Sequence, residues 1–303
     1  MRLLRLALTA LTLASYHLTS ATAAAQTPLT DSATPQVHVL TTRRGAWHLA
    51  DTENFQACSL QSADEAVATA LACERLRKEV ADICGLTPAA WTPRCQIVLH
   101  ANDASYLAEV GAGGAKTVAS ALTRRREGRI QLRKIDVRGN VPDHLNNALP
   151  HELCHVLLAD HFQEVPLWCD EGLALLLDPL EKQSAHARDL DVAAKRGDMI
   201  SLDQLLDLRQ YPPADQWAAF YGQSSSLVRC LLQRGTPQQL LAFAEQQRSA
   251  GVNVALREVY GLNGVAELHQ HWRASLETPI EGILTPIRLA RFSTSLEHIA
   301  AER

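Results

Sequence analysis

The stretch His151-Glu152-Leu153-Cys154-His155 decides how the rest of the sequence is interpreted. In a helix, residues four apart share one face, so the imidazoles of His151 and His155 can both reach one metal ion. Glu152 then lies about 100° further round the helix, beside such a metal rather than on it. That position suits a general base that takes a proton from a metal-bound water. The pattern therefore predicts a helix with a hydrolytic metal site, which needs a third protein ligand.

Two residues compete for the place of the third ligand. His161 has the spacing of the longer pattern His-Glu-x-x-His-x-x-Gly-x-x-His. However, Leu158 occupies the position where that pattern needs a glycine to turn the chain. Glu171 is the other candidate, because a loop containing Pro166 separates it from the first helix and a second helix can present it to the histidines. We favour Glu171.

These blocks resemble the gluzincin metallopeptidases, in particular the peptidase MA-like domain family of exported bacterial proteins. The resemblance covers residues 146–276 and is carried mainly by residues 149–157 and 165–174, with weaker support from Tyr221-Gly222-Gln223-Ser224. It implies an α+β, zincin-like fold and a Zn²⁺ ion held by His151, His155 and Glu171. One coordination position would stay open for water.

The resemblance also implies a mechanism. A zinc-activated water attacks the peptide carbonyl, Glu152 acts as general base, and the same carboxyl later gives its proton to the leaving amine. Tyr221 is the candidate donor to the oxyanion, with packing at the start of a helix as the alternative role. Thermolysin-like relatives hold a zinc histidine with an aspartate where this chain has Leu175. Here Asp170, Asp178 or a backbone carbonyl would have to do so.

The N-terminus has the pattern of a secretory signal peptide. Arg2 and Arg5 precede a short apolar stretch, and residues 21–25 are mostly alanine, so we expect cleavage after Ala25. Residues 26–35 read as a flexible mature N-terminus. The protein is therefore expected to be secreted or periplasmic. We expect no stable membrane insertion after cleavage, because the apolar stretch is too short and too interrupted for a confident span.

Charge argues against nucleic acid as a partner. The 303 residues contain 29 Lys and Arg and 33 Asp and Glu, and the signal peptide holds two of the arginines and no acid, so the mature net charge is 27 − 33 = −6. One local basic cluster is interpreted as the solvated surface of a hairpin rather than a binding patch. Its members are Arg124, Arg125, Arg126, Arg129, Arg133 and Lys134.

Seven cysteines in an exported chain suggest disulfide bonds. Cys154 and Cys169 flank the candidate ligands, so a bond between them could staple the site. The alternative is that both are buried thiols that pack as small apolar residues. Cys73 and Cys84 fall on one helix too far apart to pair with each other, which leaves Cys58 and Cys95 as their available partners.

The pattern of elements divides the chain in two. Residues 36–141 are predicted to form an α/β lobe with a mixed sheet and one long helix at 62–84. Residues 142–290 are predicted to form a helical lobe with the metal site, and residues 291–303 are predicted to be a tail. Strands are expected at 37–42, 47–49, 95–100, 117–123 and 129–137, and 55–60 is ambiguous. Helices are expected at 102–110, 143–159, 168–178, 181–195, 202–208, 217–234, 237–250, 252–260 and 265–276.

The functional expectation is an exported zinc metallopeptidase with a peptide or protein substrate. The alternative is a catalytically silent, zincin-fold binding module at the cell envelope. The intact Glu152 favours the enzyme, because a module without activity has no need of the base. Nothing in the sequence favours a zinc hydrolase for a non-peptide bond, and no motif identifies the substrate.

Overall fold

The computed structural model describes residues 38–277. The predicted signal peptide, its cleavage site after Ala25, the segment 26–35 and the tail 291–303 lie outside the described residues. All described residues belong to one compact unit. Among the helices of residues 38–277, none combines the length and the apolar character that crossing a membrane requires.

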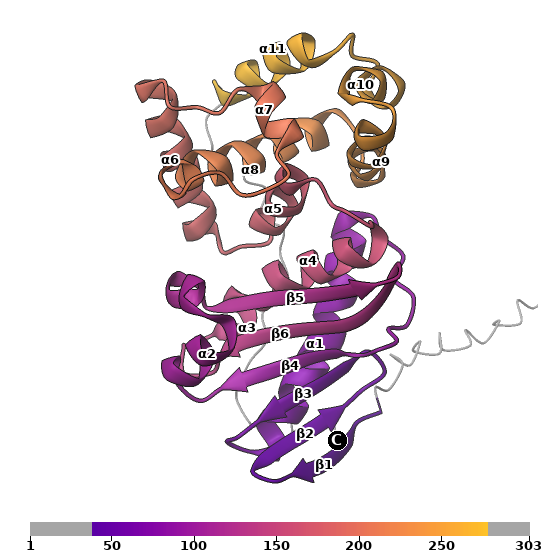
Figure 1. Cartoon of the computed structure of the whole chain (residues 1–303), viewed down its shortest axis with the longest axis vertical. Helices are drawn as coiled ribbons and strands as arrows, with labels where there is room; N and C mark the ends of the chain where they lie inside the picture. The colour runs from indigo at the N-terminus through magenta and orange to yellow at the C-terminus, as the bar shows by residue number, and fades with distance from the viewer. Residues whose placement is uncertain (1–37, 278–303) are drawn as a thin grey trace, which may run out of the picture. The chain divides into compact units, whose positions relative to one another are not determined.

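The first part of the chain forms a mixed sheet, as the sequence predicts, and this sheet has six strands (Figure 1). The strand order is β1-β2-β3-β4-β6-β5, in which the β3–β4 and β4–β6 pairs are parallel and the other pairs antiparallel. The ambiguous segment 55–60 is a strand of this sheet. The strands are β1 (Leu40–Arg44), β2 (Trp47–Asp51), β3 (Phe55–Ser59), β4 (Cys95–His100), β5 (Ala119–Arg126) and β6 (Arg129–Arg138).

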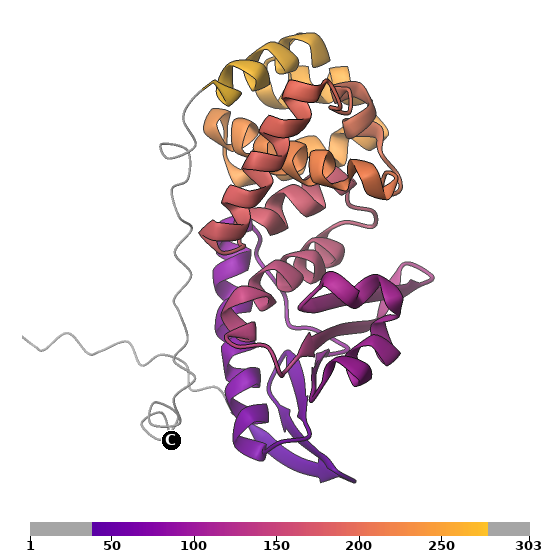
Figure 2. The same ribbon diagram turned by 90° about the vertical axis from the view of Figure 1, so that its left-hand side faces the viewer.

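The long helix α1 (Ala63–Cys84) runs along one face of this sheet (Figures 1 and 2). It starts where the Ser62 side chain accepts a hydrogen bond from the Glu65 N–H, and it ends at Gly85, whose left-handed φ of 68° suits a glycine. Its buried side packs on β2, β3 and α4. A short helix α2 (Asp103–Val110) follows β4, and a 3-10 helix, η1 (Ala112–Lys116), begins after Gly111.

The second part of the described chain is helical. The expected helix at 143–159 is wrong in one respect, because it is split into α3 (His144–Asn147) and α4 (Leu149–His161). Pro150 has no N–H for the carbonyl of Asn146, and its ring would clash with that carbonyl, so a continuous helix is unfavourable. The remaining helices are α5 (Leu167–Leu176), α6 (Leu180–Arg196), α7 (Leu202–Asp207), η2 (Ala214–Gln216), α8 (Trp217–Arg234), α9 (Pro237–Ser249), α10 (Val252–Tyr260) and α11 (Val265–Leu276).

The hairpin of β5 and β6 holds the C-terminal end of α4, which corrects the interpretation of its basic cluster as wholly solvated. Arg125 donates to the carbonyls of Ala159 and, at 2.8 Å, of Phe162. Arg133 is buried and pairs with Asp160. These contacts satisfy carbonyls that a helix end leaves unpaired and place cations at its negative end.

Trp91 completes this anchor from the other side. Its indole Nε1 donates to Asp160 Oδ2 over 3.0 Å, and the guanidinium of Arg133 lies 5.2 Å from the ring centroid. Of the basic cluster, only Arg124, Arg126 and Arg129 are exposed. The end of α4 is thus fixed by a buried polar network.

Candidate metal centre

Helix α4 carries both histidines of the candidate site on one face. The ring centroids of His151 and His155 lie 4.8 Å apart at an interplanar angle of 78°. The opposite side of the helix buries Leu153, Leu157 and Cys154 in the core. The hydrophobic packing therefore fixes which way the histidines point.

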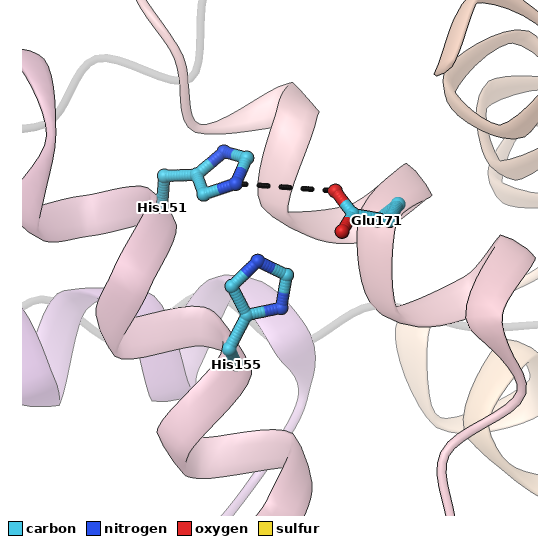
Figure 3. Close-up of side chains that lie close together, drawn as sticks. All are labelled: His151, His155 and Glu171. Carbon is cyan, nitrogen blue, oxygen red and sulfur yellow. Dashed lines mark ion pairs between the residues drawn. The ribbon is translucent and has the colours of Figure 1, made fainter. Parts of the chain in front are cut away.

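Helix α5 brings Glu171 to these histidines, as Figure 3 shows. One ligand atom from each of His151, His155 and Glu171 lies within 4.8 Å of the others, and His151 Nε2 is 4.0 Å from Glu171 Oε2. The Glu171 side chain is only 6% exposed. Glu171, sixteen residues after His155 in the sequence, therefore joins the two histidines in one cluster at the junction of α4 and α5.

Gly172 lets α5 pack closely against α8, and this contact sets the position of Glu171. A Cβ at Gly172 would lie 2.4 Å from Val228 Cγ2 and 2.6 Å from the carbonyl oxygen of Ser224. Both atoms belong to α8, so any side chain at this position would separate the two helices. The absence of a side chain at Gly172 thus lets the backbone beside Glu171 pack closely against α8.

Each histidine has a carboxylate at its Nδ1 atom. His155 Nδ1 and Asp170 Oδ1 are hydrogen-bonded at 2.8 Å, and His151 Nδ1 lies 3.3 Å from Asp178 Oδ1. Asp178 is fully buried and also pairs with Lys182 at 2.9 Å. Carboxylates at Nδ1 orient the rings and leave Nε2 for a metal. Both aspartates considered in place of Leu175 therefore lie beside a histidine.

These carboxylates shift the proton equilibria of the site. Burial opposes the charged form of His155, but Asp170, Glu171 and Glu152 outweigh it and raise its pKa to about 10. Burial likewise opposes ionisation of Asp178, but His151 and Lys182 outweigh it and lower the pKa of that carboxyl. The site is therefore an anionic environment that attracts a cation.

Glu152 and His161 differ in their relation to this cluster. Glu152 is half-buried in the first turn of α4, and its charge acts on His155. His161, the rejected third ligand, is exposed at the C-terminal end of α4 and meets the Phe162 ring edge-to-face, with a centroid distance of 4.8 Å and an interplanar angle of 86°. It is not a member of the cluster that includes Glu171.

Two tyrosines lie close to Glu171, and the sequence pointed to only one of them. Tyr221 is half-buried on α8, where burial and the charge of Glu171 raise its pKa to about 12. Tyr211, in the loop between α7 and η2, donates a hydrogen bond to Glu171 Oε1. Burial and the charge of Glu171 also raise the pKa of Tyr211, so its hydroxyl keeps its proton. Its only sequence signal is the following Pro212-Pro213, which keeps the segment out of a helix.

All seven cysteines are described, and all are free thiols in the structure. Cys154 does not bond Cys169. Its Sγ lies 3.8 Å from Cys84 Sγ, at the C-terminal end of α1. Burial raises the pKa of Cys169, and the neighbouring Cys84 together with burial raises that of Cys154. All three thiols are buried, and the charges of Cys84 and Cys169 both contribute to the raised pKa of Cys154.

The donor set fits Zn²⁺. Two imidazole nitrogens and one carboxylate oxygen are the ligands of many catalytic zinc sites, with a fourth position left open. Zinc–ligand bonds of about 2.0–2.2 Å would require the three donor atoms to approach one another more closely than the 4.0 Å between His151 Nε2 and Glu171 Oε2.

Comparison with known proteins adds no assignment. No protein-family model matches the sequence, and no curated protein matches it. Geometry and chemistry of the site therefore carry the functional argument alone.

Proposed function

We propose that this protein is an exported zinc metallopeptidase whose metal is held by His151, His155 and Glu171. The observation that supports it most is the convergence of these three side chains, with Asp178 and Asp170 at the Nδ1 atoms of the two histidines. A structural metal site would have no need of a further acid, whereas Glu152 stands on the same helix next to His151. The predicted signal peptide at residues 1–25 supports the proposal of export.

Each residue has a defined part in this proposal. When bound, zinc supplies a Lewis acid and lowers the pKa of water. Glu152 takes the proton of the attacking water and passes it to the leaving amine, so that the peptide bond breaks without a free amide anion. Asp170 and Asp178 hold the two imidazoles in place. Tyr221 is the candidate donor to the oxyanion, whereas Tyr211 donates its single hydroxyl proton to Glu171 and so orients that ligand.

The test measures zinc content and peptide-library cleavage in parallel on the full chain. Glu152→Gln should retain zinc and lose about 10²–10⁴-fold in cleavage, because only the base is removed. Glu171→Ala should lose both zinc and cleavage, because two histidines alone bind the metal weakly. His161→Ala is the matched control, and it should leave both unchanged.

Three results would contradict the proposal. Cleavage that survives Glu152→Gln removes the base mechanism. Full zinc content in Glu171→Ala, together with loss in His161→Ala, transfers the third ligand to His161. Stoichiometric zinc without cleavage of any library peptide favours the silent binding module.

A further inference from the structure

A cavity of about 230 Å³ lies on the side of α8 that faces away from α5. Ser224 and Val228 of α8 contact Gly172 of α5, whereas Ser225 and Arg229 line the cavity. Helix α6 and the last residues of α11 form its other walls. The cavity is therefore distinct from the metal centre, although both use α8.

Arg229 is a half-buried cation in this cavity without an anionic partner among residues 38–277. Its Nη2 donates to Gln183 Oε1, which is its one hydrogen bond to the part of the chain described. Burial alone shifts its pKa, down to about 10, so the guanidinium remains charged at neutral pH. A guanidinium has five N–H donors, and a partly buried cation with donors to spare is a binding site for an anion.

Gln183 fixes the direction of this cation. Its Nε2 donates to the carbonyls of Asp178, at 2.6 Å, and Leu176, at 2.9 Å, so its Oε1 is held toward Arg229. Asp191, the one acid in the cavity wall, pairs with Lys195 at 2.5 Å and does not contribute to the pKa of Arg229. The guanidinium is thus oriented before any ligand arrives.

The remaining walls favour an apolar body on the ligand. Ala187, Leu190, Ala194 and Leu276 contribute apolar surface. The three serine hydroxyls of the wall donate to backbone carbonyls: Ser225 to Gly222, Ser226 to Gln223 and Ser275 to Trp272. Arg229 is the one cationic donor among the described residues that line the cavity, and its planar pair of N–H groups suits the two oxygens of a carboxylate better than the three of a phosphate.

We propose that this cavity binds a small monocarboxylate with a short apolar chain, whose carboxylate pairs with Arg229. The volume is below the roughly 300 Å³ at which pockets for drug-sized ligands begin, so the ligand is short. The proposal does not depend on zinc or on peptidase activity, because none of the metal-site residues lines the cavity.

The test titrates the full chain with hexanoate and, in parallel, with its neutral analogue hexanamide, by calorimetry. Saturable binding of hexanoate to one site is expected, with hexanamide about tenfold weaker or more because the charged hydrogen bond is lost. Arg229→Gln should remove the preference for hexanoate, whereas Arg234→Gln, an exposed cation at the end of the same helix, should leave it unchanged.

A second variant guards against misfolding of the first. Ala187→Leu keeps Arg229 and fills the cavity, so it should block both compounds, and thermal melting checks that each variant is folded. Equal binding of hexanoate and hexanamide, unchanged binding by Ala187→Leu, or no saturable binding would overturn the proposal. Tighter binding of inorganic phosphate than of hexanoate would overturn the assignment to a carboxylate.

Discussion

At the scale of single residues, the site is defined by which carboxylate faces which histidine. His155 has Asp170 at 2.8 Å and His151 has Asp178 at 3.3 Å, so the two imidazoles are oriented by two different acids. The acids come from α5 and from the turn after it, and neither depends on the other. Orientation of each ring can therefore be tested separately.

Zinc binding should release a proton from His155. Its pKa is raised from 6.5 to about 10 in the metal-free protein, so between these values the folded protein holds a proton that a metal must displace. Zinc affinity should increase as the pH rises toward about 10, because fewer molecules then carry the proton on His155. In Asp170→Asn the pKa of His155 should fall, so zinc binding at about pH 8 should release fewer protons. Calorimetry in buffers of different ionisation enthalpy measures this proton release.

The raised pKa of His155 also determines how the stability of the metal-free protein depends on pH. Because the folded pKa is raised, protonated His155 contributes stability that is fully present below pH 6.5 and lost as pH rises through about 10 in the metal-free protein. Asp82 is an exposed acid on α1, so Asp82→Asn is the control. It should change neither the proton release on zinc binding nor the pH dependence of stability. Equal proton release in Asp170→Asn and the parent protein would contradict the role of Asp170.

The two tyrosines should differ in their effects on zinc and on turnover. Tyr211→Phe removes the hydroxyl that donates to Glu171 and should lower zinc affinity about tenfold or more, because Glu171 loses the group that orients it. Tyr221→Phe should lower kcat about 10²-fold with zinc content unchanged, as expected for a lost oxyanion donor, because no hydrogen bond engages its hydroxyl among the described residues. Zinc titration and steady-state kinetics on one peptide measure both effects, and an unchanged kcat in Tyr221→Phe would remove Tyr221 from this role.

At the scale of elements, the close packing of α5 on α8 positions Glu171. Gly172→Ala places a Cβ 2.6 Å from the backbone oxygen of Ser224, which cannot move without the helix. We expect a loss of about 1–3 kcal/mol in unfolding free energy and a lower zinc content. Gly113→Ala, where no atom lies within 4 Å of the added Cβ, is the matched control for denaturation and zinc analysis. Equal stability of the two variants would refute the packing argument.

Elements were predictable from sequence where local signals agree with packing. Ser62 and Gly85 delimit α1, and the bounds of α8, α10 and α11 follow their apolar periodicity. Local sequence signals fail where contacts with residues distant in the sequence determine the secondary structure. Segment 55–60 becomes a strand through pairing with β2 and β4.

The same limit applies to the candidate site. The spacing within α4 predicts that His151 and His155 share a face, because the helix alone sets it. Tyr211 could not be found in this way, because a loop forty residues from Glu171 brings its hydroxyl there. Nor could the burial of Arg133, since it depends on Asp160 and Trp91 of other elements.

At the scale of the whole molecule, α4 joins the sheet to the helices. It packs on α1, β5 and α5, and α1 also touches α9. Zinc on α4 and α5 should therefore stabilise residues 38–277 as one unit rather than the helices alone. At a free zinc concentration one hundred times Kd, the expected gain is about 2.7 kcal/mol.

Thermal melting measures this coupling. Far-ultraviolet circular dichroism and tryptophan fluorescence should give one coincident transition whose Tm rises with zinc and falls when a chelator is added. Glu171→Ala should show no rise, which separates specific binding from binding at the surface. Two transitions, with only one sensitive to zinc, would show that the sheet unfolds independently.

The anchoring of α4 by the β5–β6 hairpin has a consequence for genetic screens. Arg125 and Arg133 touch no member of the metal cluster, yet they hold the helix that carries two of its ligands. A random mutagenesis screen for lost activity should therefore return hairpin arginines alongside the histidines. Read by phenotype alone, such a map would assign the hairpin to substrate recognition, whereas its effect is transmitted through the position of a helix.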